Sequence, residues 1–176
     1  MRSTLVATVL IIALCALPAL AQQSTREDFK EFTKATSGRW IGEITWVTDW
    51  PGLGKRGDKV TGYSEIKMTE DGNAIIGRQL AGSGSATWIT VYDAGAKQIR
   101  ESGVDSGGTV WTIVYSKVGD KWVGVQTGSL ADGSKVESKT TLTLSDNGNT
   151  QTWTGPTTVG GKKVDDQHDV YRRVSK

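Results

Sequence analysis

Turn-forming residues return along this chain at a regular spacing, and that spacing constrains the fold more than any other feature. From residue 52 onward, pairs rich in Gly, Asp, Asn and Ser separate runs rich in Val, Ile, Thr, Trp and Tyr, which favour strands. The turn segments are Gly52–Gly57, Asp71–Gly72, Ser83–Gly84, Ala94–Gly95, Ser106–Gly107, Gly119–Asp120, Asp132–Gly133, Asn147–Gly148 and Gly160–Gly161. Short strands joined by short turns predict an all-β fold. We expect an antiparallel up-and-down barrel of about 8–10 strands, because closure removes exposed strand edges.

One short helix is predicted ahead of the strands. Ser24 followed by Glu27 fits a capping box, and Phe29 and Phe32 lie three residues apart on one helical face. Gly38 ends the pattern. We expect this helix to close one end of the barrel.

The N-terminus is typical of a secretory signal peptide. Arg2 precedes an apolar run from Leu5 to Leu17, and Ala19-Leu20-Ala21 fits an A-x-A cleavage site. Cys15 offers an alternative, a lipoprotein anchor, but Leu14 stands where that motif has a small residue. We therefore expect a signal peptide over residues 1–21 and one barrel domain over residues 22–176, exported to the periplasm or beyond the cell.

Composition excludes several classes of function. The expected mature chain has no cysteine, so it has neither a disulfide nor a thiolate metal site. Its 20 basic and 19 acidic residues are not segregated, which argues against nucleic-acid binding. Many expected strands are shorter than the ~9–11 residues that an outer-membrane barrel needs, and charged residues occur within them, so we expect a barrel that does not span a membrane. We also expect a monomer.

Both ends of the expected domain carry motifs that resemble the calycin superfamily, which includes the lipocalins. Gly38-Arg39-Trp40 matches the G-x-W motif that opens the first barrel strand, and Asp169-Val170-Tyr171-Arg172-Arg173 resembles the last strand. The resemblance implies a barrel closed by a basic side chain packed over the first tryptophan. Alternation that places Val170, Arg172 and Val174 inward assigns this role to Arg172, as a cation–π partner of Trp40.

The end of the chain also resembles, more weakly, nitrobindin-like haem barrels, which have a haem-ligating histidine on the last strand. His168 is the only histidine in the chain, and if it faces inward it is a candidate haem ligand. The other interpretation is a polar residue near the barrel mouth. Haem binding would make the protein a redox or nitrogen-oxide-handling barrel.

No residue pattern predicts an enzyme. The expected mature chain lacks a second histidine, a cysteine, a G-x-S-x-G motif and a phosphate-binding loop. Asp165, Asp166, His168 and Asp169 form the densest ionisable cluster, but alternation splits them between two faces. Two ligands on a face are too few for a metal, so we predict no metal site.

These features favour a role in binding a small, largely apolar molecule. The seven tryptophans can either line a cavity or fill the barrel, and which of them face inward stays open. Trp88, Trp111 and Trp122 are the expected lining, and Trp50 and Leu53 lie in a long loop that can cover the mouth. The alternative is a barrel with a filled interior that acts through its surface.

Overall fold

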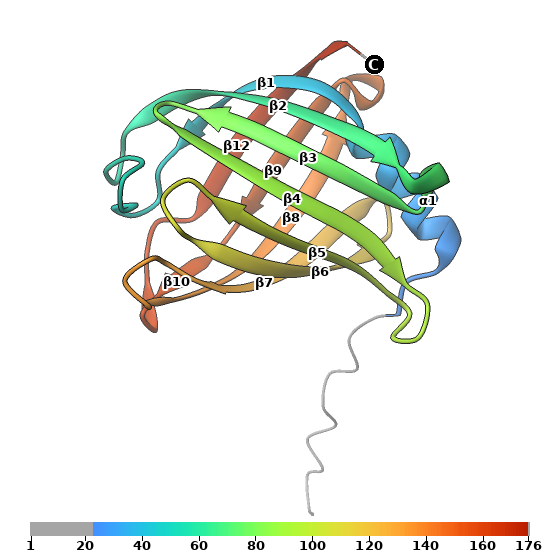
Figure 1. The fold of residues 1–176 in the computed structure, drawn as a ribbon. Coiled ribbons are helices and arrows are strands. Elements are labelled where there is room, and N and C mark those ends of the chain that lie inside the picture. The colour runs from blue at the N-terminus through green and yellow to red at the C-terminus, as the bar shows by residue number, and fades with distance from the viewer. Residues whose placement is uncertain (1–22, 176) are drawn as a thin grey trace, which may run out of the picture.

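Ten strands close into one antiparallel barrel in the computed structural model, which describes residues 23–175 (Figure 1). Each strand from β1 to β8 pairs with the next, and β12 pairs with β9 on one side and β1 on the other. The predicted all-β up-and-down barrel is confirmed, and this architecture fits a lipocalin-like fold. The expected leader, residues 1–21 with Cys15, lies outside the described residues.

The bounds of the elements follow the turn signals of the sequence. They are α1 (Arg26–Thr36), β1 (Gly38–Thr45), β2 (Lys59–Thr69), β3 (Ala74–Ala81), β4 (Gly84–Asp93), β5 (Gln98–Asp105), β6 (Val110–Val118), β7 (Lys121–Ser129), β8 (Lys135–Ser145), β9 (Thr150–Gly155), β10 (Thr157–Val159), β11 (Lys162–Lys163) and β12 (Gln167–Ser175). The short β10 and β11 form a hairpin that pairs with β8 outside the ring of ten. Within residues 23–175 no helix has the length and apolar character needed to cross a bilayer.

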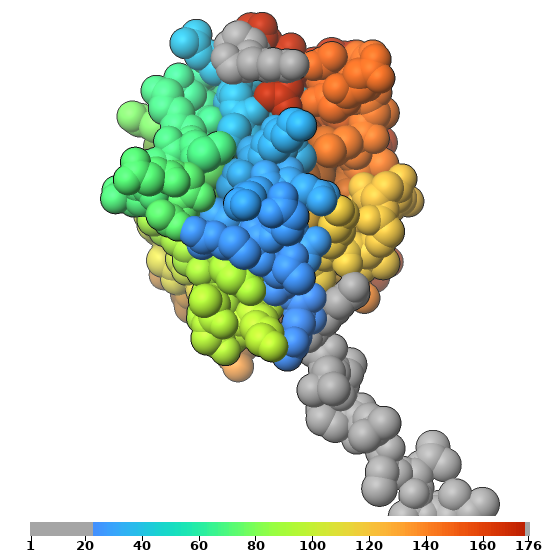
Figure 2. Space-filling model, turned by 90° about the vertical axis from the view of Figure 1, so that its right-hand side faces the viewer, coloured from blue at the N-terminus to red at the C-terminus, as the bar shows by residue number. Residues whose placement is uncertain are grey.

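Helix α1 lies across one end of the barrel (Figures 1 and 2). Its N-cap is Thr25, whose hydroxyl accepts a hydrogen bond from the backbone N–H of Asp28, and the Asp28 carboxylate accepts one from the Thr25 backbone N–H in return. The capping box therefore begins one residue later than predicted from Ser24 and Glu27. Ser24 is buried instead, and its hydroxyl donates to the backbone carbonyl of Tyr115.

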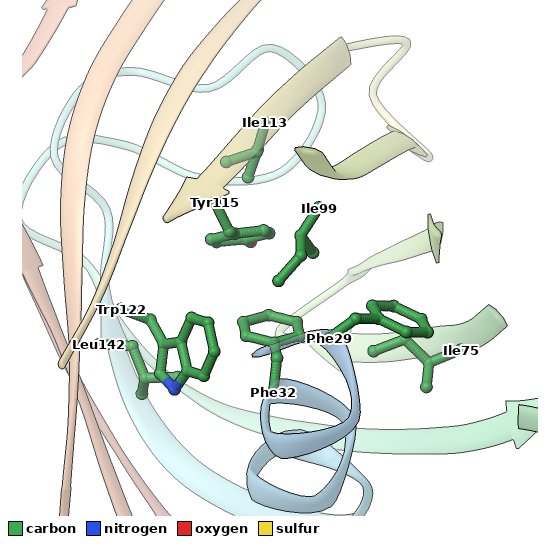
Figure 3. Packing of buried hydrophobic residues seen from close by; sticks show 8 residues of the cluster. All are labelled: Phe29, Phe32, Ile75, Ile99, Ile113, Tyr115, Trp122 and Leu142. Carbon is green, nitrogen blue, oxygen red and sulfur yellow. The ribbon is translucent and has the colours of Figure 1, made fainter. Parts of the chain in front are cut away.

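The phenylalanines of α1 fill the helix end of the barrel. Phe29 and Phe32 point from the helix into a cluster of side chains from several strands (Figure 3). The Phe32 ring lies 4.7 Å from the ring of Tyr115 and packs edge-on at 5.2 Å from Trp122. Burying aromatic rings at ~150–250 Å² each makes this cluster the main core of the domain.

The barrel closes between β1 and β12, as predicted, but Arg173 rather than Arg172 makes the contact with Trp40. The Arg173 guanidinium lies 4.0 Å from the Trp40 ring centroid and donates hydrogen bonds to the backbone carbonyls of Ala35 and Ser37. It therefore combines a cation–π contact with capping of the helix C-terminus.

Arg172 is exposed because the phase of β12 is opposite to the one predicted. Tyr171 and Asp169 share the inward face with Arg173, whereas Val174 is exposed. Burying Tyr171 removes a larger aromatic surface from water than burying a valine would. The alternation rule identified two faces of this strand, and packing selected the other one.

Candidate functional site

The barrel interior is filled beneath α1 and hollow beyond it. A cavity of about 270 Å³, here called the inner chamber, begins at Phe32, Thr36 and Trp40. A second cavity of about 210 Å³, the outer chamber, continues to the loop between β1 and β2. The two chambers share several wall residues, including Gln79, Ala86 and Trp111, so they are neighbouring spaces along one lumen. The sequence left open whether the barrel has a cavity or a filled interior. The structure shows that it is filled at one end only.

Two glycines in the wall keep indole rings from filling the inner chamber. Trp88 pairs across the sheet with Gly77, and Trp111 pairs with Gly103. A Cβ atom on Gly77 would lie 2.0 Å from the Trp88 indole, and one on Gly103 would lie 2.2 Å from the Trp111 indole. Each indole therefore lies flat over a glycine of the neighbouring strand. Since the rings lie against the wall, the space along the axis stays open.

The loop between β1 and β2 covers the outer chamber, at the end of the barrel away from α1 (Figure 1). The Trp50 indole N–H donates to the Asp105 carboxylate at 2.8 Å and to the Thr109 hydroxyl at 3.0 Å. The Leu53 side chain sits so close to Gly84 that a Cβ there would lie 2.5 Å from it. Both loop residues line the outer chamber, so the loop is held across the mouth by specific contacts with β4, β5 and the turn after β5.

Trp46 contributes a buried donor without a partner to the outer chamber. Its indole stacks beside Trp50 with ring centroids 6.1 Å apart, and no described residue accepts a hydrogen bond from its Nε1–H. Leaving a buried N–H unsatisfied costs about 1–3 kcal/mol. An acceptor atom of a molecule in the outer chamber would remove that cost.

Glu101 is a buried carboxyl group in the wall of the inner chamber. Its side chain is 7% exposed and accepts hydrogen bonds from Trp111 Nε1 at 3.1 Å, Thr90 Oγ1 at 3.0 Å and the Tyr115 hydroxyl at 3.2 Å. Burial raises the pKa of Glu101 to about 6, although the three donors act in the opposite direction. Such a perturbed acid in a cavity is a typical signature of a functional site.

Asp169 is the second buried carboxyl group and lines the outer chamber. It accepts hydrogen bonds from Gln167 Nε2 at 2.7 Å and, weakly, from the Thr45 backbone N–H at 3.4 Å. Burial raises the pKa of Asp169 above its usual range. Tyr171, its neighbour on the same face, accepts a hydrogen bond from Gln79 at 2.6 Å. Polar groups therefore line both chambers, and a ligand that carries polar atoms has hydrogen-bonding groups to meet in each of them.

The tryptophans expected to line the cavity separate into two groups. Trp88 and Trp111 line the inner chamber, and Trp50 and Leu53 line the outer chamber. Trp122 packs against Phe32 in the core under α1 and lines neither chamber. The expected set is thus brought together along one lumen, except for Trp122.

His168 faces the outside of the barrel, so the inward orientation on which the haem hypothesis depends is wrong. It is exposed, whereas its neighbours Gln167 and Asp169 point into the lumen. Asp165 is exposed as well and forms an ion pair with Arg56 at 2.5 Å. Among the described residues, no group of three or more His, Cys, Asp and Glu side chains is arranged to hold a metal ion.

The residues that sequence reasoning missed are Glu101 and the glutamines of the lumen. Gln79, Gln126, Gln151 and Gln167 all line the inner chamber. Ile99, Glu101 and Gly103 are every second residue of β5 and share one face. This alternation was the sequence signal that could have placed Glu101 inside the barrel. A scan of protein-family models found no match to the chain, and a search of curated proteins found none either.

Proposed function

We propose that this protein is a small-molecule carrier of the lipocalin-like type that holds its ligand in the inner and outer chambers. The observation that supports it is the hollow lumen with indoles laid against glycines, because a barrel evolved only for stability would fill that space. An engineered protein cavity of about 150 Å³ binds benzene, so about 270 Å³ suits a molecule with one or two rings. The protein binds without catalysing a reaction.

The proposal includes the compartment and the family. The pattern of residues 1–21 supports export, and the G-x-W motif with its arginine contact supports a place in the calycin superfamily. If export occurs as proposed, the mass of the protein recovered from outside the cytoplasm corresponds to a chain that begins at Gln22. A protein retained in the cytoplasm at full length would contradict this part of the proposal.

Titration with N-phenyl-1-naphthylamine tests ligand binding, because this neutral probe fluoresces strongly only in an apolar site. We expect saturable emission with one probe bound per chain. Ala86→Phe places a ring between the two chambers and should abolish the signal, whereas Thr87→Phe on the outer face of the same strand should leave it unchanged. Emission that does not saturate, or that survives Ala86→Phe, would show that the lumen is not the binding site.

A further inference from the structure

The inner chamber combines aromatic walls with one uncompensated carboxylate. A buried carboxylate in a protein is normally paired with a cation, because burial without a partner is costly. Within residues 23–175 no ion pair joins Glu101 to a basic side chain, and its three contacts are with neutral donors. The site therefore has a negative charge and no positive partner within the described protein.

Glu101 also keeps room for one more hydrogen bond. A carboxylate accepts about four hydrogen bonds, two on each oxygen. Oε2 accepts from Thr90 and Tyr115, whereas Oε1 accepts only from Trp111. The remaining acceptor position of Oε1 is complementary to an N–H donor from a molecule in the chamber.

The charges of the whole lumen have one sign. Glu101 lines the inner chamber, and Asp105 and Asp169 line the outer chamber. None of the described residues that line either chamber is Lys, Arg or His. A narrow space with walls of one charge concentrates ligands of the opposite charge. The mouth and the interior therefore both favour a cation over an anion.

The indoles add a second cation-binding element. Trp88 and Trp111 both pair across the sheet with Gly103, so they flank the strand that carries Glu101. Both line the inner chamber. The face of an indole attracts a cation within about 6 Å with 0.5–2 kcal/mol, the higher values applying to desolvated sites. The Trp111 indole also donates to Glu101, so the chamber holds a carboxylate, an indole in contact with it and a second indole on the strand at the other side of β5. A carboxylate and aromatic faces in one chamber are the chemistry that recognises an ammonium group.

We propose that the ligand of this barrel is an organic ammonium ion with one or two rings, whose N–H group is hydrogen-bonded to Glu101 and whose carbon skeleton lies between Trp88 and Trp111. This inference rests on the proposed carrier function. It narrows the ligand class from small molecules in general to amines that are protonated at neutral pH. The spare acceptor on Oε1 favours an ammonium with at least one N–H over a quaternary ammonium.

Three probes of similar shape and different charge test the inference by calorimetry at pH 7.5. They are 1-naphthylmethylammonium, the neutral 1-naphthylmethanol and the anion 1-naphthoate. We expect the cation to bind at least tenfold more tightly than the alcohol and the anion to bind most weakly. Glu101→Gln should reduce affinity for the cation about tenfold and leave affinity for the alcohol unchanged, whereas Glu137→Gln on the outer face should change neither.

The outcomes distinguish this inference from the carrier function. If the cation and the alcohol bind equally to the wild-type protein, the ammonium assignment is overturned while the carrier function stands. If none of the three probes binds and N-phenyl-1-naphthylamine also fails, both are overturned. Binding of the alcohol to Glu101→Gln shows that the variant retains its folded lumen, so a loss of cation affinity alone can be assigned to the carboxylate.

Discussion

Glu101→Gln should make the stability of the protein less dependent on pH. The variant keeps the shape of the side chain and removes its charge. Burial raises the pKa of Glu101 in the folded protein from the ordinary value of 4.5 to about 6. At 1.36 kcal/mol for each pKa unit, this difference corresponds to about 2 kcal/mol. The folded state therefore disfavours the ionised carboxylate by that amount relative to the unfolded chain.

The sign follows from proton binding. Between pH 4.5 and pH 6 the folded protein binds more protons at Glu101 than the unfolded chain does, so stability falls as pH rises through this window. The contribution is present below pH 4.5 and is lost above pH 6. The free energy of unfolding of Glu101→Gln minus that of wild type should therefore be about 2 kcal/mol higher at pH 7.5 than at pH 4.

Urea unfolding followed by tryptophan fluorescence at pH 4, 5, 6 and 7.5 measures this difference. The other buried carboxyl group, Asp169, titrates in both proteins and cancels in the comparison. Tyr115, which donates to Glu101, does not titrate in this range because burial raises its pKa well above the usual value. A difference between the two proteins that is the same at all four pH values would refute the reasoning.

Three other perturbations probe the lumen and the closure of the barrel. Gly103→Ala places a Cβ 2.2 Å from the Trp111 indole, so the ring should be displaced into the inner chamber. We expect at least a tenfold loss of affinity for N-phenyl-1-naphthylamine, and an unchanged titration would contradict this expectation. Arg173→Met should lower the free energy of unfolding by about 2 kcal/mol, because it removes the cation–π contact and bonds to helix carbonyls. The exposed Arg172→Met should change it by less than about 0.5 kcal/mol in the same urea experiment, and equal losses would be inconsistent with the assignment. Affinity for 1-naphthylmethylammonium should fall about tenfold from pH 7.5 to pH 5, because Glu101 with a pKa of about 6 becomes protonated, while affinity for 1-naphthylmethanol should not change.

Local signals in the sequence were sufficient for the architecture. Turn residues between β-favouring runs predicted the meander, and the two phenylalanines three residues apart predicted the helix that closes one end. These features depend on residues close together in the chain, where period and turn chemistry act directly. The contact between the first and last strands was predicted as well, because a meander that closes must join them.

The tertiary structure decided which face of each strand turned inward and what the interior contained. Alternation divides β12 into a face with Val170 and Val174 and a more polar face with Asp169 and Arg173, and only packing around Trp40 selects the face with Arg173. Trp111 lies flat because Gly103 is its partner on the next strand, a pairing that depends on register between strands. The burial of the Glu101 carboxylate likewise depends on the register between strands, which sets its neighbours on the adjacent strands. A sequence specifies which residues alternate, whereas burial and cavity volume depend on residues from several strands that meet only in the closed barrel.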